Sequence, residues 1–143
     1  MKGFDFYQDH ANMWRWRLKD ENDHIVADSG EGYVDKADCK KGSELFTTLG
    51  VDAPERKVVQ YAASEGGPAY VYFLDDKGEW RWHFQARNNK IIADSSSKTF
   101  ANEADVKAGI AKVRALLKSL GGNGGSGYVP PTTGGSTGST RFA

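Results

Sequence analysis

The sequence predicts an α+β fold made of two tandem β-β-β-α repeats, in which an antiparallel sheet packs against helices. The first observation is self-similarity, because Trp14–Leu18 recurs as Trp80–Phe84 and Ile25–Ser29 recurs as Ile91–Ser95 in the same register. The second is period-two alternation inside these segments, and the third is an apolar stripe at helical spacing between residues 106 and 117. A unit this short cannot bury its apolar face alone, so the copies should pack on each other.

The composition of the chain sets the boundaries of its parts. We expect repeat one at residues 1–51, a linker at 52–68, repeat two at 69–120 and a flexible tail at 121–143 that is rich in Gly, Ser, Thr and Pro. Within the linker, residues 57–61 fit either a short strand or a helical turn. The sequence does not choose between the two.

Each repeat should begin with a meander of three strands. Phe4 and Phe6 share one face of the first strand, and Tyr70 and Tyr72 take the same places in repeat two. In the second strands the tryptophans alternate with cationic residues, which predicts rings in the core and charges on the other face. Residues 24–27 and 90–93 are β-branched third strands, and Gly78 can supply the positive φ of a hairpin turn.

A helix should close each repeat. Asp35 and Asn102 are the expected N-caps, the second helix should end near Leu120, and Gly50 should end the first helix in the left-handed conformation. Cys39 is the only cysteine, which excludes an internal disulfide, and we expect it to be buried in the first helix.

Charge and hydropathy exclude several classes of protein. Lys plus Arg equals Asp plus Glu at 19 each, so there is no net charge to attract nucleic acid or an anionic membrane over a distance. No apolar run is long enough for a membrane span and the start lacks a signal peptide, which predicts a cytoplasmic protein. His10, His24 and His83 lack metal-ligand spacing, so no metal or cofactor is expected.

The polar side of the second strands is the candidate binding face. If this side is open, its cationic groups form a row that could hold phosphates or stack on bases and aromatic side chains. The alternative is an ordinary solvated face in which these cations pair across strands with Asp5, Asp28 or Glu79. The candidate residues are Arg15, Arg17, Arg81 and His83, flanked by Tyr7 and Phe73.

The tail offers a second candidate. Its apolar residues could form an extended arm that lies against a neighbour, through Tyr128, Val129, Arg141 and Phe142. The alternative is a disordered tail without a role, because this composition cannot build a core.

The combined pattern resembles the YegP-like family of small tandem-repeat proteins, whose function is uncharacterised. The resemblance rests on an aromatic first strand that ends in Asp9 or Asp75, on the Trp-Arg-Trp segments, and on Ser29 followed by Glu31–Tyr33. It covers nearly all of residues 3–120 and implies two β-β-β-α units related by a pseudo-twofold axis. Repeat two departs from the family pattern at Ser96–Phe100.

These observations favour a non-enzymatic interaction or assembly module that binds a protein partner or its own copies through the sheet surface or the C-terminal arm. A nucleic-acid-binding module is the alternative. Catalysis has little support, because Asp28-Ser29 and Asp94-Ser95 recur without a recurring His and read as turn caps.

Overall fold

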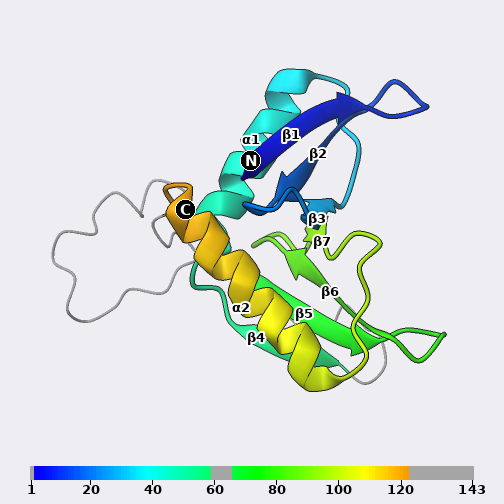
Figure 1. The fold of residues 1–143 in the computed structure, drawn as a ribbon. Coiled ribbons are helices and arrows are strands. Elements are labelled where there is room, and N and C mark those ends of the chain that lie inside the picture. Colours follow the sequence, from blue (N-terminus) through cyan, green and yellow to red (C-terminus); the bar gives the residue numbers. More distant parts are fainter. Residues whose placement is uncertain (1, 59–65, 123–143) are drawn as a thin grey trace, which may run out of the picture.

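The computed structural model describes residues 2–58 and 66–122, which form one seven-stranded sheet and two helices (Figure 1). Each repeat contributes three strands and a helix, as predicted, and one further strand lies between them. In chain order the elements are β1 Gly3–Gln8, β2 Trp14–Lys19, β3 Ile25–Ser29, α1 Lys36–Leu49, β4 Glu55–Val58, β5 Ala69–Leu74, β6 Trp80–Gln85, β7 Ile91–Asp94 and α2 Glu103–Ser119.

The two meanders join edge to edge in a single sheet. Its strand order is β1-β2-β3-β7-β6-β5-β4, and every neighbouring pair is antiparallel except β4 and β5. The junction is short, because β3 and β7 pair only at Asp28 with Asp94 and at Ser29 with Ala93. The prediction that the copies pack on each other is therefore confirmed, and they do so by sharing one sheet.

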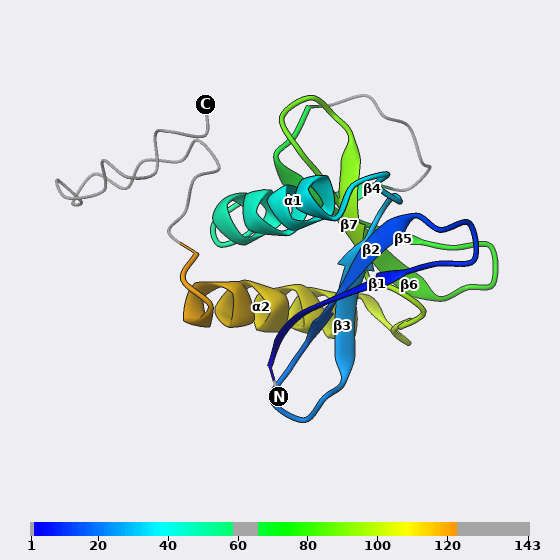
Figure 2. The same cartoon turned by 90° about the horizontal axis from the view of Figure 1, so that it is seen from above.

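Both helices cover the same face of this sheet, and the core lies between the two layers (Figure 2). Trp16 and Trp82 point into that core and are almost fully buried, while Trp14 and Trp80 pack against its border. Phe46 of α1 stacks on Trp16 at 5.6 Å between ring centroids. Strict alternation along β2 and β6 thus sends the rings inward, as the sequence predicted.

The β1–β2 and β5–β6 turns are built alike. In repeat one, Oδ1 of Asp9 accepts hydrogen bonds from the backbone N–H groups of Ala11 and Met13. In repeat two, Oδ1 of Asp75 accepts from residues 77 and 79 in the same way. Asn12 and Gly78 occupy the matching position with φ of 62° and 78°, a conformation that Gly and Asn tolerate best.

The helix ends confirm one cap and correct two details. The side chain of Asn102 accepts a hydrogen bond from the backbone N–H of Asp105, and the helix ends beside Leu120. Asp35 stands at the N-cap of α1 but makes no side-chain cap bond, and Gly50 has right-handed φ and ψ of −75° and −11°. Gly50 is needed for space instead, since a Cβ there would lie 2.7 Å from the hydroxyl of Tyr70.

Part of the expected linker belongs to the sheet. β4 pairs in parallel with β5, from Glu55 opposite Tyr70 to Val58 opposite Phe73. This settles the start of the ambiguous segment as strand, and its continuation lies outside the described residues. A strand here gives repeat two an outer neighbour on the far side of β5.

Candidate functional site

The candidate binding face lies opposite the helices, where one row of paired residues crosses the sheet. Strand register places Asp5 beside Arg17 and Arg17 beside Asp28, and it continues through Asp94 to His83. Residues paired in this way point to the same side of a sheet. The row therefore brings acidic and basic groups from both repeats together.

Arg15 and Arg81 are held by the aspartates of the turns. Nε of Arg15 donates to Oδ2 of Asp9 at 2.5 Å, and Nε of Arg81 donates to Oδ2 of Asp75 at 2.8 Å. These hydrogen bonds hold the pKa of both carboxyls below the usual range. The sequence proposed cross-strand acids as partners, but both arginines instead bond to the residue that also caps their turn.

The other two predicted cations contact the predicted aromatic residues. The Arg17 guanidinium lies 4.0 Å from the centroid of the Tyr7 ring, a cation–π distance. The His83 ring lies 5.4 Å from that of Phe73 and is only 5% exposed. Burial lowers the pKa of His83, which favours the neutral imidazole near pH 7. The structure thus assembles all six predicted residues into one cation–π pair, one pair of aromatic rings and two arginine–aspartate pairs.

The centre of the face is the pair Asp28 and Asp94, which the sequence interpretation treated as turn caps. Asp94 does cap its turn, since its Oδ1 accepts from the backbone N–H of Ser96 at 2.7 Å. Burial, then the hydrogen bond and charge of Asp94, raise the pKa of Asp28 to about 7. Asp28 therefore gains or loses its proton near neutral pH, beside the carboxyl of Asp94.

A cavity adjoins the Asp94 side of this acidic centre, on the side of repeat two. It has a volume of about 300 Å³ and is lined by Phe73, Arg81, His83, Asp94 and Ser96 among others. This hollow gives the acidic centre a recess that a side chain of moderate size can enter.

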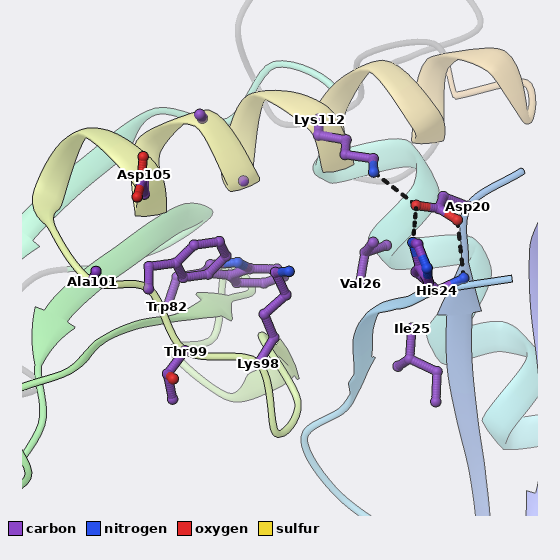
Figure 3. Close-up of a pocket in the computed structure, with 13 residues that line it drawn as sticks. Asp20, His24, Ile25, Val26, Trp82, Lys98, Thr99, Ala101, Asp105 and Lys112 are labelled. Atoms are coloured by element: carbon purple, nitrogen blue, oxygen red, sulfur yellow. Dashed lines mark hydrogen bonds and ion pairs between the residues drawn. The ribbon is translucent and has the colours of Figure 1, made fainter. Parts of the chain in front are cut away.

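A larger cavity of about 460 Å³ opens between β3 and α2 on the helix side (Figure 3). On one wall, Nζ of Lys112 donates to Oδ2 of the fully buried Asp20 at 2.7 Å, and His24 lies on the same carboxylate. The hydrogen bond from Lys112 lowers the pKa of Asp20 to about 2. Trp82 and Lys98 form the opposite wall.

The Asp20–Lys112 pair ties repeat one to the helix of repeat two. The repeat register puts Ala86 and Leu45 at the matching positions, and both are apolar members of the core or its border. The sequence interpretation missed the ion pair. The sequence did contain a signal for this ion pair, namely that Asp20 and Lys112 are charged where the equivalent residues of the other repeat are apolar. Only the structure shows that these two charged residues are in contact.

The remaining features that the sequence analysis considered are the cysteine, the C-terminal arm, metal ligation and membrane helices. Cys39 is free and buried, as expected. Tyr128, Val129, Arg141 and Phe142 of the candidate arm lie outside the described residues. Within residues 2–58 and 66–122, no cluster of His, Cys, Asp and Glu is arranged to hold a metal ion. Neither helix in this part of the chain is long and apolar enough to cross a bilayer.

Known proteins share this sequence pattern and this fold. The family described as Domain of unknown function (DUF1508) matches residues 9–54 and again 75–117. A UPF0339 protein of Stutzerimonas stutzeri is 31% identical over 111 residues, which cover 78% of this chain and 85% of that protein. A UPF0339 protein of Neisseria meningitidis is 36% identical over 55 residues, covering 38% of this chain and 96% of the relative.

Solved structures agree. The solution structure of yegP from E. coli, a protein of unknown function, has a TM-score of 0.62 at 23% identity and covers 82% of this chain and 87% of its own. The UPF0339 protein SO3888 from Shewanella oneidensis has a TM-score of 0.61 at 18% identity, with coverage of 80% and 83%. These likenesses show the fold alone. The two matched repeats and the 31% identical relative establish that the chain belongs to the YegP-like DUF1508 family, whose function is unknown.

Proposed function

We propose that the protein is a non-enzymatic interaction module that binds a protein partner, or its own copies, through the open face of the sheet. The binding centre is the Asp28–Asp94 pair, and the group it takes is a lysine or arginine side chain of the partner. Tyr7 and Phe73 flank the centre as aromatic contacts. The single observation that carries this proposal is a shared acidic centre on a face whose arginines already have contacts of their own.

The charges of the face support a cationic partner over an anionic one. Arg15 and Arg81 are neutralised by Asp9 and Asp75, and Arg17 lies on Tyr7. A cation placed over the two central carboxyls would displace the proton of Asp28 and leave both ionised. The affinity should therefore rise with pH through the region of the raised pKa of Asp28, about 7.

We also propose that the repeats are related by a pseudo-twofold axis that passes between Asp28 and Asp94. Support comes from the repeat register, in which these two aspartates are equivalent, and from their direct pairing across β3 and β7. Such an axis would present the same groups on both sides of the centre, which suits a partner with two basic side chains or two equal copies. The single free cysteine fits a reducing compartment, and we place the module in the cytoplasm.

A nucleic-acid-binding module has less support. It needs guanidinium groups that are available to phosphates, whereas Arg15 and Arg81 are committed to turn aspartates. Arg56, which the register places on the same face, also donates hydrogen bonds to neighbouring groups. The central carboxyls would also repel a phosphate backbone. Arg17 with Tyr7 is the one arrangement that fits a stacked base, and the test below includes it.

The test is an NMR titration of the full chain at pH 8 with short peptides that carry paired arginines or lysines, and with a single-stranded oligonucleotide. We expect the amide signals of Arg17, Asp28, His83 and Asp94 to shift with the basic peptides. The double variant Asp28→Asn with Asp94→Asn should weaken this binding about tenfold or more, because both carboxylates of the binding centre are lost. Asp76→Asn, in an exposed turn, is the matched control and should bind like the parent protein.

The outcomes separate the candidates. Absence of any shift with basic peptides overturns the proposal for this face. Oligonucleotide binding that strengthens in the Asn double variant and disappears in Arg17→Ala replaces it with the nucleic-acid function. Light scattering of the same samples reports whether the partner is a second copy of the chain.

A further inference from the structure

The two meanders differ in what lies beyond their outer strands, β1 and β5. β5 is covered by β4, which pairs with it in parallel from Tyr70 to Phe73. β1 is the last strand on the opposite border, and no described residue pairs with its outer side (Figure 1). An exposed strand edge presents unpaired N–H and C=O groups that readily accept another strand.

The lack of cover at β1 is visible in its side chains. Tyr70 and Tyr72 of β5 are 0% and 6% exposed. Phe4 and Phe6 hold the matching positions in β1, yet both are only partly buried at the border of the core. Among the described residues, repeat two has a strand beyond these aromatic rings and repeat one has none, which accounts for the difference in burial.

A groove follows this uncovered border. It has a volume of about 390 Å³ and lies between β1 and α1, with Phe4, Phe6 and Thr47 among its lining residues. Leu120, the residue that ends α2, also lines it. The groove is thus apolar on the strand side, and the chain reaches its border as it leaves α2.

The backbone beyond α2 is directed toward this groove. Gly121 has φ of 102°, and the N–H of Gly122 bonds back to the carbonyl of Leu117. Gly122 lies so close to α1 that a Cβ there would meet the carbonyl oxygen of Thr47 at 2.5 Å. Lys2, just before β1, donates to Ser119 at 3.2 Å. The chain therefore leaves the described structure beside the first residues of β1.

Repeat two shows what a chain can do from this position. After α1 ends at Leu49, the chain turns and enters β4 at Glu55. β4 then runs parallel to β5, with Glu55 opposite Tyr70 near the start of β5. The same spacing after Ser119 leads to Gly125, and the next residues include the apolar pair Tyr128-Val129. From Gly122 to Tyr128 an extended chain spans about 20 Å, enough to run along β1.

We propose that the segment from Gly125 to Val129 of this chain adds to the free edge of β1 as a parallel strand and places an apolar side chain in the groove beside Phe4 and Phe6. This repeats in repeat one the arrangement that β4 has in repeat two. Pro130 and Pro131 follow directly and end the pairing, because proline has no N–H to donate. The occupant is the chain's own tail, so the edge is closed within one molecule.

The experiment measures amide hydrogen exchange of β1 by NMR in the full chain and in the double variant Tyr128→Ser with Val129→Ser. We expect exchange of the β1 amides to become about tenfold faster or more in the variant, because an unpaired edge opens locally at low cost. The amides of β5 should not change. Phe142→Ser, in the same tail but beyond the prolines, is the matched control and should leave β1 protected.

Two results overturn the inference. Equal β1 exchange in the parent protein and the double variant means that the tail does not cover this edge. A parent protein that light scattering shows to be a dimer, and that the double variant converts to a monomer, assigns the edge to the tail of a second copy. Neither result bears on the open face, since Asp28 and Asp94 lie on other strands and are assayed with basic peptides.

Discussion

Repeat one and repeat two share their strands, turns and tryptophans but differ in what lies beyond them. Repeat two buries Tyr70 and Tyr72 beside a neighbouring strand, whereas Phe4 and Phe6 of repeat one lie at a border that no described strand covers. Repeat one carries Asp20 in a buried ion pair where repeat two has Ala86. A duplicated unit thus keeps the contacts that build its own fold and diverges where it meets its surroundings.

The largest expected effect is the loss of stability when the aromatic residues at the equivalent positions of β1 and β5 are truncated. Tyr70→Ala should lower the free energy of unfolding by about 3–5 kcal/mol, because a fully buried ring is lost from the core. Phe4→Ala should cost about 1–2 kcal/mol, since its ring is only partly buried. Urea unfolding followed by tryptophan fluorescence measures both. Equal losses would contradict the difference between the two edges.

The next effect concerns the ion pair between repeats. Asp20→Ala should cost about 1–3 kcal/mol, because Lys112 and two backbone N–H groups lose a buried acceptor. Adding Lys112→Leu recreates the apolar combination of repeat two and should recover part of the loss. Urea unfolding of the single and double variants gives the coupling energy. Lys107→Leu, exposed on the same helix, is the control.

The pH dependence of this pair has a defined sign. The pKa of Asp20 is lowered to about 2 in the folded state, so its stabilisation is present above pH 4 and is lost as the pH falls toward 2. Asp20→Ala should remove that part of the acid sensitivity. Parallel curves for the two proteins between pH 5 and pH 2 would contradict the assignment.

A smaller effect of opposite sign is expected at the centre of the open face. The pKa of Asp28 is raised to about 7, so the folded state holds a proton that the unfolded chain releases near pH 4. Stability from this group is therefore lost as the pH rises from 4 to 7. Asp28→Asn should be more stable than the parent at pH 8 by about 1 kcal/mol or less, because solvent partly screens this site.

Urea unfolding at pH 5 and pH 8 measures this effect. Asp94→Asn is the matched variant, since removing either charge relieves the repulsion between the carboxyls. A parent protein whose stability does not fall between these two pH values relative to both variants would contradict the raised pKa of Asp28.

The smallest expected effect is a change in Tm when the equivalent turn aspartates of the two repeats are substituted. Asp9→Asn and Asp75→Asn each weaken one arginine bond in the same kind of turn, so the two variants should lower Tm by small and equal amounts. Thermal unfolding by circular dichroism measures the change. Clearly unequal Tm shifts would show that the two turns contribute differently to stability despite their matching hydrogen bonds.

Sequence alone predicted much of this fold because its signals are local. Alternation along Trp14–Lys19 and Trp80–Gln85 fixes which face is apolar, and the helical stripe of residues 106–117 fixes the buried side of α2. Asn102 was identified as a cap from its chemistry. The six candidate surface residues share one face for the same reason, although their partners were not predicted.

Other features depend on contacts between distant residues. The pairing of Asp28 with Asp94 requires the register of β3 against β7, and the ion pair of Asp20 requires the position of α2. The role of Gly50 was misassigned because the nearby Tyr70 hydroxyl, not the local backbone, excludes a side chain. Part of the linker became β4 because an available sheet edge can order a segment that has weak propensity of its own.

By itself, the sequence determined the repeated unit, the inward direction of its tryptophans and the outward direction of its charges, since these follow from the period of a strand or helix along the chain. Only the tertiary structure decided which charges meet, which aspartate holds a proton near neutral pH and which strands form the two edges of the described sheet. The physical reason is that electrostatic shifts and burial depend on distances through space, and these are set when two repeats close one sheet.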